Sequence, residues 1–385
     1  MYQNAMLLGL CQFLFMASVS VGLSFTGIVG EKMASSTALS TLPFLTMTAT
    51  TALLTLYLPK IFARWGYKRA FVIGTLLGSL GGLLAAAGVY WNSFFLFCAA
   101  GILTGCYQAS ALYYRFAAAD SATAEYKSKA IAWVLNGGIL AALLGPLFGK
   151  YSLHLFTQDY LGSYLLVACL ALVVLPFIGL TKLPPRNSVT TKDAISVKEL
   201  LQHPRAIAVI LLSAGGYAMM MMVMLASPLA MNHCGYHAAD AASVIQWHLL
   251  GMFAPSLITG SLINRYGSLP IGIAGCLILI AGCVMALSGI ALTNFHWGLM
   301  LVGVGWNFMY MAGTTLIMQW SDLPLRSKLQ SVNEFITFGV MTITAGGTGW
   351  LYQLLGWQSL LIFAVVVTGS LLLIVFWQRR HTALF

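Results

Sequence analysis

The sequence predicts an all-α membrane protein in which twelve transmembrane helices form two six-helix halves. Three observations predict this class: 59% of the 385 residues are hydrophobic, only 7% are charged, and long apolar segments recur along the whole chain. Soluble domains carry about 25% charged residues. The composition therefore excludes a cytosolic enzyme, a disordered chain and a nucleic-acid-binding protein.

The apolar segments are long enough for helices to cross a hydrocarbon core of about 30 Å. Helices are expected because lipid offers the backbone no partner outside its own segment. We expect spans at residues 5–28, 37–58, 70–90, 94–114, 129–149, 162–181, 207–230, 241–262, 270–291, 295–318, 331–352 and 358–378. The long polar connection after the sixth span predicts an N-terminal half at 1–181, a cytoplasmic linker at 182–205 and a C-terminal half at 206–385.

Twelve spans place both termini on one side of the membrane, and the basic residues indicate which side. Seventeen of the 19 Lys and Arg residues fall in the loops and ends on the side of the termini, while only Lys32 and Lys150 fall on the other. Cytoplasmic loops carry the excess of Lys and Arg. We therefore expect both termini in the cytoplasm.

Two loops suggest that the halves are repeats, which is typical of transporters. In the loop after the second span, Arg64 lies two residues before Gly66. In the loop after the eighth span, Arg265 lies two residues before Gly267. These loops resemble the G-x-x-x-D-R-x-G-x-R-R loop of the major facilitator superfamily, with Pro59, Ala63 and Asn264 as departures, and span five carries a similar G-P-x-x-G kink. The resemblance implies conformational roles for Arg64, Gly66, Arg69, Gly145, Pro146, Asn264, Arg265 and Gly267.

Soft side chains gather in spans seven and eight. Met220 and Met224 are four residues apart, as are His248 and Met252, so each pair shares a helix face. Counted from Tyr236 in the connecting loop, Met224 lies level with His248 and Met220 level with Met252. Thioethers and imidazoles bind copper, so the spacing is compatible with a four-ligand metal site. It is equally compatible with methionines that fill gaps in apolar packing.

The same pairs resemble the CcoA-like copper importers of the superfamily, as do residues 245–256, 114–120 and 305–308. The resemblance implies copper import across a bacterial inner membrane for assembly of a cbb3-type cytochrome c oxidase. It implies that Met220, Met224, His248 and Met252 contact copper, the transported substrate. The wider family also includes riboflavin importers. An importer of an organic solute such as riboflavin is therefore the alternative, with Trp247, Trp306, Tyr107 and Asn307 as its contacts.

Other polar residues complete the expected site. His233, Cys234 and His237 surround the outer loop and could receive copper before it crosses, although a solvated loop explains them as well. We expect Gln12, Gln108, Gln246, Trp247 and Asn307 to line a central cavity. There is no Gly-rich phosphate loop, no nucleophile with a base and no carboxylate pair, so we expect no enzyme and no cofactor. We expect the protein to be a monomer. Its expected partners are copper, the bilayer and copper chaperones.

Overall fold

A computed structural model describes residues 2–123, 126–183, 204–318 and 323–381, and these residues form helices without any strand. Eleven segments within them are long and apolar enough to span a membrane. The last segment, 332–376, is interrupted at Gly356, whose backbone is not helical (φ 71°, ψ 177°), so it comprises two helices. The described residues therefore form the twelve spans that the sequence predicts.

The chain divides into two compact units. Unit 1 comprises Met1–Val189 and Met231–Gln246, and unit 2 comprises Thr190–Ala230 and Trp247–Phe385. Residues 231–246, from the second half of the chain, thus belong to the same unit as the first six helices. Most of the expected linker, 184–203, lies outside the described residues.

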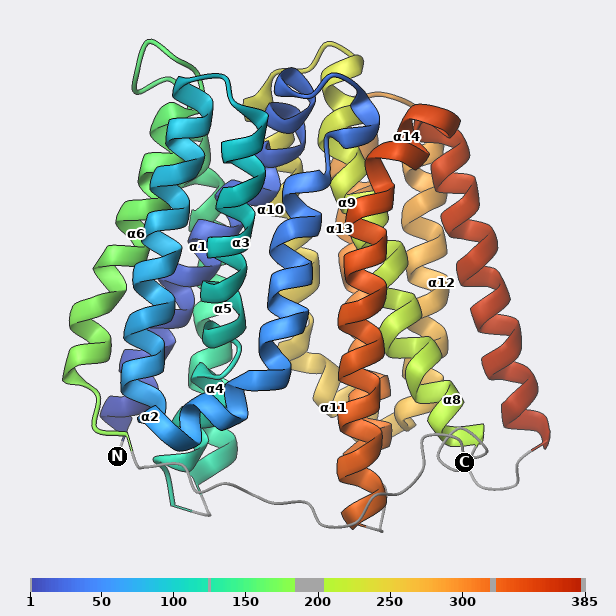
Figure 1. Cartoon of the computed structure of the whole chain (residues 1–385). Helices are drawn as coiled ribbons and strands as arrows, with labels where there is room; N and C mark the ends of the chain where they lie inside the picture. Colours follow the sequence, from blue (N-terminus) through green and yellow to red (C-terminus); the bar gives the residue numbers. More distant parts are fainter. Residues whose placement is uncertain (1, 124–125, 184–203, 319–322, 382–385) are drawn as a thin grey trace. The chain divides into compact units, whose positions relative to one another are not determined.

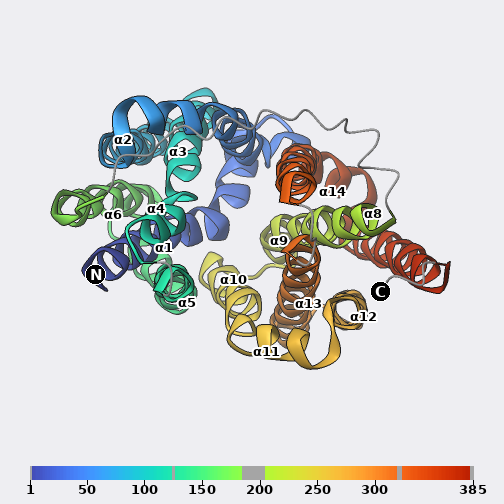
Figure 2. The ribbon, with the colours of Figure 1, turned by 90° about the horizontal axis from the view of Figure 1, so that it is seen from below.

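Unit 1 is a helical bundle. Its elements are α1 (Tyr2–Met33), η1 (Thr37–Leu39), α2 (Leu42–Tyr90), α3 (Phe94–Ala111), α4 (Tyr114–Asp120), α5 (Lys127–Ser152) and α6 (Leu161–Leu180), together with the first part of α10 (Ala238–Phe253). The main packing partners are α2 with α3, α1 with α5, and α6 with both α1 and α2. Figure 2 shows α1, α3, α5 and α6 end-on, gathered around one another.

Small residues bring α3 close to α2. A Cβ on Gly101 would lie 2.6 Å from the carbonyl oxygen of Pro43, and one on Gly105 would lie 2.9 Å from the Thr50 Cβ. Thr46 Oγ1 donates a hydrogen bond to the Cys98 carbonyl across the same interface at 2.8 Å. In lipid there is no hydrophobic force between helices, so close backbone contact and interhelical hydrogen bonds stabilise the pair.

Unit 2 is the second bundle. Its elements are α8 (Pro204–Ile210), η3 (Leu211–Gly215), α9 (Gly216–His233), α11 (Ser256–Tyr266), α12 (Ser268–Leu287), α13 (Leu292–Met318) and α14 (Leu323–His381), together with the end of α10. Its packing is dominated by α12 with α13 and with α14. The η3 segment is a π-helical turn that joins α8 to α9 in one long span. Figure 1 shows α14 as two antiparallel segments, drawn in red, on either side of its break.

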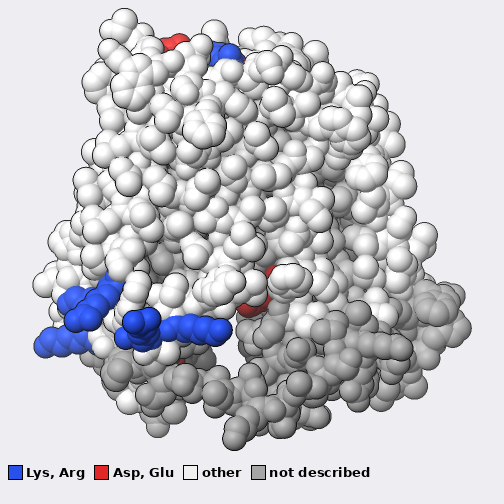
Figure 3. Space-filling model, in the orientation of Figure 1, with Lys and Arg blue, Asp and Glu red and all other residues white. Residues whose placement is uncertain are grey.

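Basic side chains lie near the ends of the membrane spans, including those at the break in α2 at Gly66. On the face in Figure 3, Lys and Arg gather near the end where Figure 1 places the N-terminus. The broad band above them shows no Lys or Arg among the described residues until the opposite end. This distribution is the one that a bilayer requires, because a charge at the hydrocarbon centre is costly.

Candidate functional site

A hollow of about 80 Å³ lies inside unit 1, between α1, α2, α3 and α6. Its walls are mainly aromatic and small side chains, and none of the described residues that line it is charged. The lining includes Phe15, Ser18, Gly22, Thr26, Phe44, Met47, Phe97, Thr104, Tyr107, Gln108 and Tyr164. Small-molecule sites are likewise mostly apolar with a few polar groups, although they are larger, at about 300–1,000 Å³. The character of the lining therefore suits an uncharged organic molecule.

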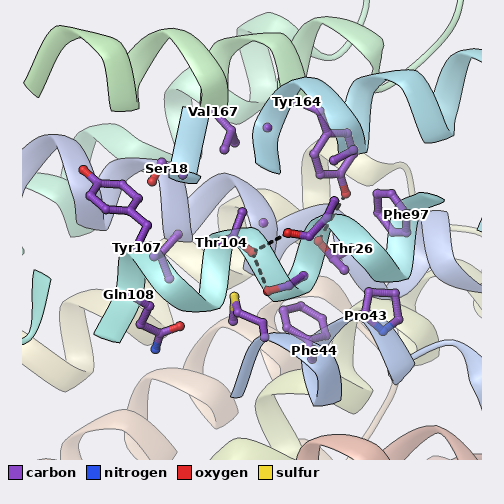
Figure 4. Close-up of a pocket in the computed structure, with 18 of the residues that line it drawn as sticks. Ser18, Thr26, Pro43, Phe44, Phe97, Thr104, Tyr107, Gln108, Tyr164 and Val167 are labelled. Atoms are coloured by element: carbon purple, nitrogen blue, oxygen red, sulfur yellow. Dashed lines mark hydrogen bonds between the residues drawn. The ribbon is translucent and has the colours of Figure 1, made fainter. Parts of the chain in front are cut away.

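Ring contacts fix the walls of the hollow. Phe15 meets Tyr107 edge to face, with ring centroids 5.0 Å apart, and Phe97 meets Tyr164 in the same way at 5.1 Å. Figure 4 shows Phe97 and Tyr164 at one end of the hollow and Tyr107 at the other. Such edge-to-face pairs add about 0.5–1.5 kcal/mol to the burial of the rings. The flat walls are thus in place before a cargo molecule arrives.

Most polar groups of the lining already have partners. Ser18 Oγ donates to the Phe15 carbonyl at 2.6 Å, and Thr104 Oγ1 lies 3.1 Å from the Gly101 carbonyl. The hydroxyls of Thr26 and Tyr164 share a hydrogen bond of 3.1 Å. Two groups differ, because the buried carbonyl oxygen of Gln108, Oε1, and the buried hydroxyl of Tyr107 have no hydrogen-bond partner among the described residues.

The four residues expected to bind copper all belong to unit 2 and are all buried. Met220, Met224 and Met252 are at most 7% exposed, and His248 is fully buried. The Nδ1 atom of His248 lies 2.7 Å from the Leu299 carbonyl oxygen. Since a carbonyl can only accept, Nδ1 carries the hydrogen, and Nε2 is left without a partner among the described residues.

Asn307 bridges a break in the eighth span. This span comprises α10 and α11, which are separated at Ala254 and Pro255. Asn307 Nδ2 donates to the Met252 carbonyl at 2.8 Å, while its Oδ1 accepts from Thr259 Oγ1 at 2.8 Å. One α13 side chain thus satisfies a carbonyl at the end of α10 and a hydroxyl on α11. Its amide is committed to helix packing.

The remaining cavity candidates lie in different surroundings. Gln246 Nε2 donates to the Leu143 carbonyl at 2.6 Å, within unit 1. Gln12 lies beside Gly137 and is not among the lining residues of the hollow. Trp247 packs against Trp297 with centroids 5.1 Å apart. Trp306 stacks on Tyr310 at 5.3 Å.

The residues of the loop between α9 and α10 form polar contacts of their own. His233 Nε2 lies 2.8 Å from Glu31 Oε1, in an ion pair when the imidazole is protonated. The backbone N–H of His237 donates to Asp240 at 3.1 Å, which caps the start of α10. Cys234 is an exposed free thiol. Among the described residues, no three His, Cys, Asp or Glu side chains gather as a metal site.

The two loops expected to be repeats have the same backbone turn. Gly66 has φ 76° and ψ 164°, and Gly267 has φ 89° and ψ 158°. Arg64, Arg69, Asn264 and Arg265 beside these glycines are exposed.

The predicted kink residues of span five lie inside α5. Pro146 lies in the interior of this helix, and a Cβ on Gly145 would lie 3.1 Å from the Ala17 Cα of α1. The glycine thus allows a close approach between α5 and α1.

Comparison with known proteins identifies the family. The family model described as Major Facilitator Superfamily matches residues 6–319. This chain belongs to the Major Facilitator Superfamily. It is a multi-pass membrane transporter and not an enzyme.

Two relatives and two solved structures illustrate what this superfamily member is similar to. It is 34% identical over 379 residues to the riboflavin transporter RfnT of Brucella anthropi, covering 94% of this chain and 93% of that protein. The uncharacterized MFS-type transporter YdeG of Bacillus subtilis is 25% identical, over 94% of this chain and 89% of its own length.

A bacterial homologue of the human lysosomal transporter Spinster, inward-facing and occupied, matches with a TM-score of 0.75 at 15% identity, covering 98% and 96% of the two chains. The nucleoside transporter NupG matches at 0.71 and 14%, covering 98% of each chain. At these identities the structures show the fold alone.

The prediction of copper import is wrong. The relative that is 34% identical over almost the whole chain is a riboflavin transporter, and the expected link to cytochrome oxidase assembly has no support. The physical reason is that pairs of methionines four residues apart arise easily on a Met-rich apolar helix, where thioethers serve as packing groups. Met220, Met224, His248 and Met252 are therefore not assigned to copper, and neither are His233, Cys234 and His237.

Sequence reasoning missed most of the hollow. Of its lining, only Gln108 and Tyr107 were among the expected residues. A signal was nevertheless present on α1, where Phe15, Ser18, Gly22 and Thr26 recur every three or four residues. This spacing puts polar, small and aromatic residues on one face of an apolar helix.

Proposed function

We propose that this transporter carries riboflavin, or a closely related uncharged organic solute, across the membrane. The observation that carries the proposal is the 34% identity to a riboflavin transporter over 94% of this chain. An alignment that covers nearly the whole chain supports a shared cargo better than any short motif does.

The hollow of unit 1 supports the same cargo. Riboflavin is uncharged and has a flat aromatic ring system, which matches walls formed by aromatic rings and no charged residue among those described. A charged cargo would lose its hydration in this lining without gaining a counter-charge, which is costly. Five aromatic side chains line the hollow, namely Phe15, Phe44, Phe97, Tyr107 and Tyr164.

We place the protein in a bacterial inner membrane with both termini in the cytoplasm, and we propose inward transport. The support for the orientation is the 17-to-2 distribution of basic residues. Because riboflavin carries no charge, the membrane potential does no work on it. The proposal is therefore facilitated uptake down the solute's own gradient.

Uptake measurements test this function. Cells that cannot make riboflavin would express the protein, and entry of labelled riboflavin would be compared with entry into cells that carry an empty vector. We expect saturable uptake that unlabelled riboflavin suppresses. Background riboflavin uptake by protein that is abundant in the membrane would overturn the proposal, and labelled copper measured in parallel would identify an ion carrier instead.

A further inference from the structure

Gln108 lines the hollow, and its amide has an unfilled hydrogen-bonding position. Its Oε1 atom is buried and has no partner among the described residues. Figure 4 shows Gln108 at the end of the hollow where Tyr107 also lies. Buried polar atoms almost always have a hydrogen-bond partner, so each exception requires an explanation. A cargo molecule in the hollow supplies one.

The neighbouring hydroxyls do not offer a free donor beside an acceptor, as the Gln108 amide does. The hydroxyl hydrogens of Ser18 and Thr104 point to backbone carbonyls of their own helices. Thr26 and Tyr164 are bonded to each other. The Tyr107 hydroxyl points away from the hollow in Figure 4. Directional recognition of cargo in this wall thus falls to the Gln108 amide.

A primary amide holds a donor and an acceptor side by side in one plane. Its complement is a planar group with an N–H beside a C=O, which is the edge of a cyclic imide. The flavin ring carries such an imide at one end, between two carbonyls. We propose that the Gln108 amide accepts a hydrogen bond from this imide N–H and donates one to an adjacent carbonyl. The inference rests on the proposed function and names the group by which this site selects its cargo.

Uracil and thymine nucleosides carry the same imide edge as the flavin. The Gln108 amide alone therefore does not distinguish a nucleoside cargo from a flavin cargo. The two differ in the size of the ring system. The five aromatic side chains in the lining of the hollow offer stacking surface on several sides and favour the larger ring system of the flavin. Competition with uridine distinguishes the two sources in the experiment.

The experiment pairs one change in the protein with one change in the cargo. Cells expressing the parent, Gln108→Met or Gln353→Met would be given labelled riboflavin and riboflavin methylated at the imide nitrogen. Met has the length of Gln without its polar atoms, and Gln353 is an exposed residue of α14 that serves as the matched control. Uptake is divided by the amount of protein in the membrane.

We expect the parent to take up riboflavin about tenfold faster than the methylated analogue, which is the effect of about one buried hydrogen bond. Gln108→Met should lower riboflavin uptake about tenfold and reduce the preference to about one. Gln353→Met should behave like the parent. Excess uridine should compete weakly in the parent, whereas competition as strong as that of riboflavin would point to a nucleoside cargo and overturn the flavin assignment.

Other outcomes separate this inference from the function on which it rests. If the parent takes up riboflavin and Gln108→Met keeps both the rate and the preference, only the role of Gln108 is wrong. If the parent takes up no riboflavin, the function and the inference fail together. If the Gln108→Met protein does not accumulate in the membrane, Gln108→Asn takes its place in the experiment. Asn keeps the amide on a side chain that is one carbon shorter. It should show the same loss, and parental behaviour of this variant would refute the inference.

Discussion

Gly22 offers a direct test of the hollow, because a side chain there would extend into space that the cargo needs. It lies on α1 and lines the hollow. A Cβ built on it meets only Thr26 Oγ1, at 3.7 Å, which is an ordinary contact. Gly101 lines the same hollow, but its Cβ would lie 2.6 Å from a Pro43 carbonyl oxygen. The two glycines thus separate the effect of filling the hollow from the effect of disrupting the fold.

The expected magnitudes follow from these contacts. Gly22→Ala should stabilise the protein by about 0.5–1 kcal/mol, because Ala loses less conformational freedom than Gly in a helix. Gly22→Leu places a branched side chain where the cargo would lie, and overpacking costs about 1–3 kcal/mol. If that cost falls on the bound cargo, riboflavin uptake at low concentration drops about 5- to 150-fold. Gly101→Ala should instead reduce the amount of folded protein.

The assay combines labelled riboflavin uptake, divided by the protein present in the membrane, with thermal unfolding of the detergent-purified variants. The expected pattern is a Gly22→Leu protein that is abundant and unfolds at or above the parental temperature but transports poorly. A Gly22→Leu protein in normal amounts with parental uptake would refute the assignment of the hollow as the cargo site. Loss of abundance in Gly22→Ala would show that the contacts around α1 are not as described.

Three further predictions concern the turns, the driving force and the orientation. Gly267→Ala should destabilise the purified protein by about 1–3 kcal/mol, because φ 89° with ψ 158° is a region that only Gly occupies readily. Gly260→Ala, in the adjacent helix with open space around it, should be neutral or stabilising in the same thermal assay. Initial riboflavin uptake should survive an uncoupler that collapses both the potential and the pH gradient, and its loss would show ion coupling. A reporter active only outside the cytoplasm should be silent after Lys192 and active after Tyr236, whereas the reverse would overturn the orientation.

The span pattern could be predicted because it depends on composition and length. A helix that crosses lipid needs about 20 apolar residues whatever it packs against, so each span could be located without knowing its neighbours. The turns at Gly66 and Gly267 carried a basic residue two positions earlier as a signal. The turn at Gly356 has the same backbone geometry but no such basic residue, since Leu354 occupies that position.

The rotation of each helix could not be predicted in the same way. In a soluble protein the apolar face identifies the core, but in lipid the outer face is as apolar as the packed one. The exposed Leu10 and the buried Leu8 of α1 look alike in the sequence although only one of them packs inside the protein. The stripe formed by Phe15, Ser18 and Gly22 can be recognised as a wall of the hollow only once α3 and α6 are known to lie opposite it.

The chemistry of the hollow also bears on how a carrier releases its cargo. A site that satisfied every polar atom of a flavin would bind tightly and return the solute slowly, and transport needs binding strong enough for entry yet weak enough for exit. In the described part of the hollow, the hydroxyls of Ser18, Thr26 and Thr104 have protein partners. The Gln108 amide and the Tyr107 hydroxyl have unpartnered atoms, and the Tyr107 hydroxyl points away from the hollow in Figure 4, so the Gln108 amide remains as the proposed directional contact. On the proposed function, selectivity would come from a single edge and flat walls, and the binding energy would stay modest. Such an arrangement would favour turnover over retention.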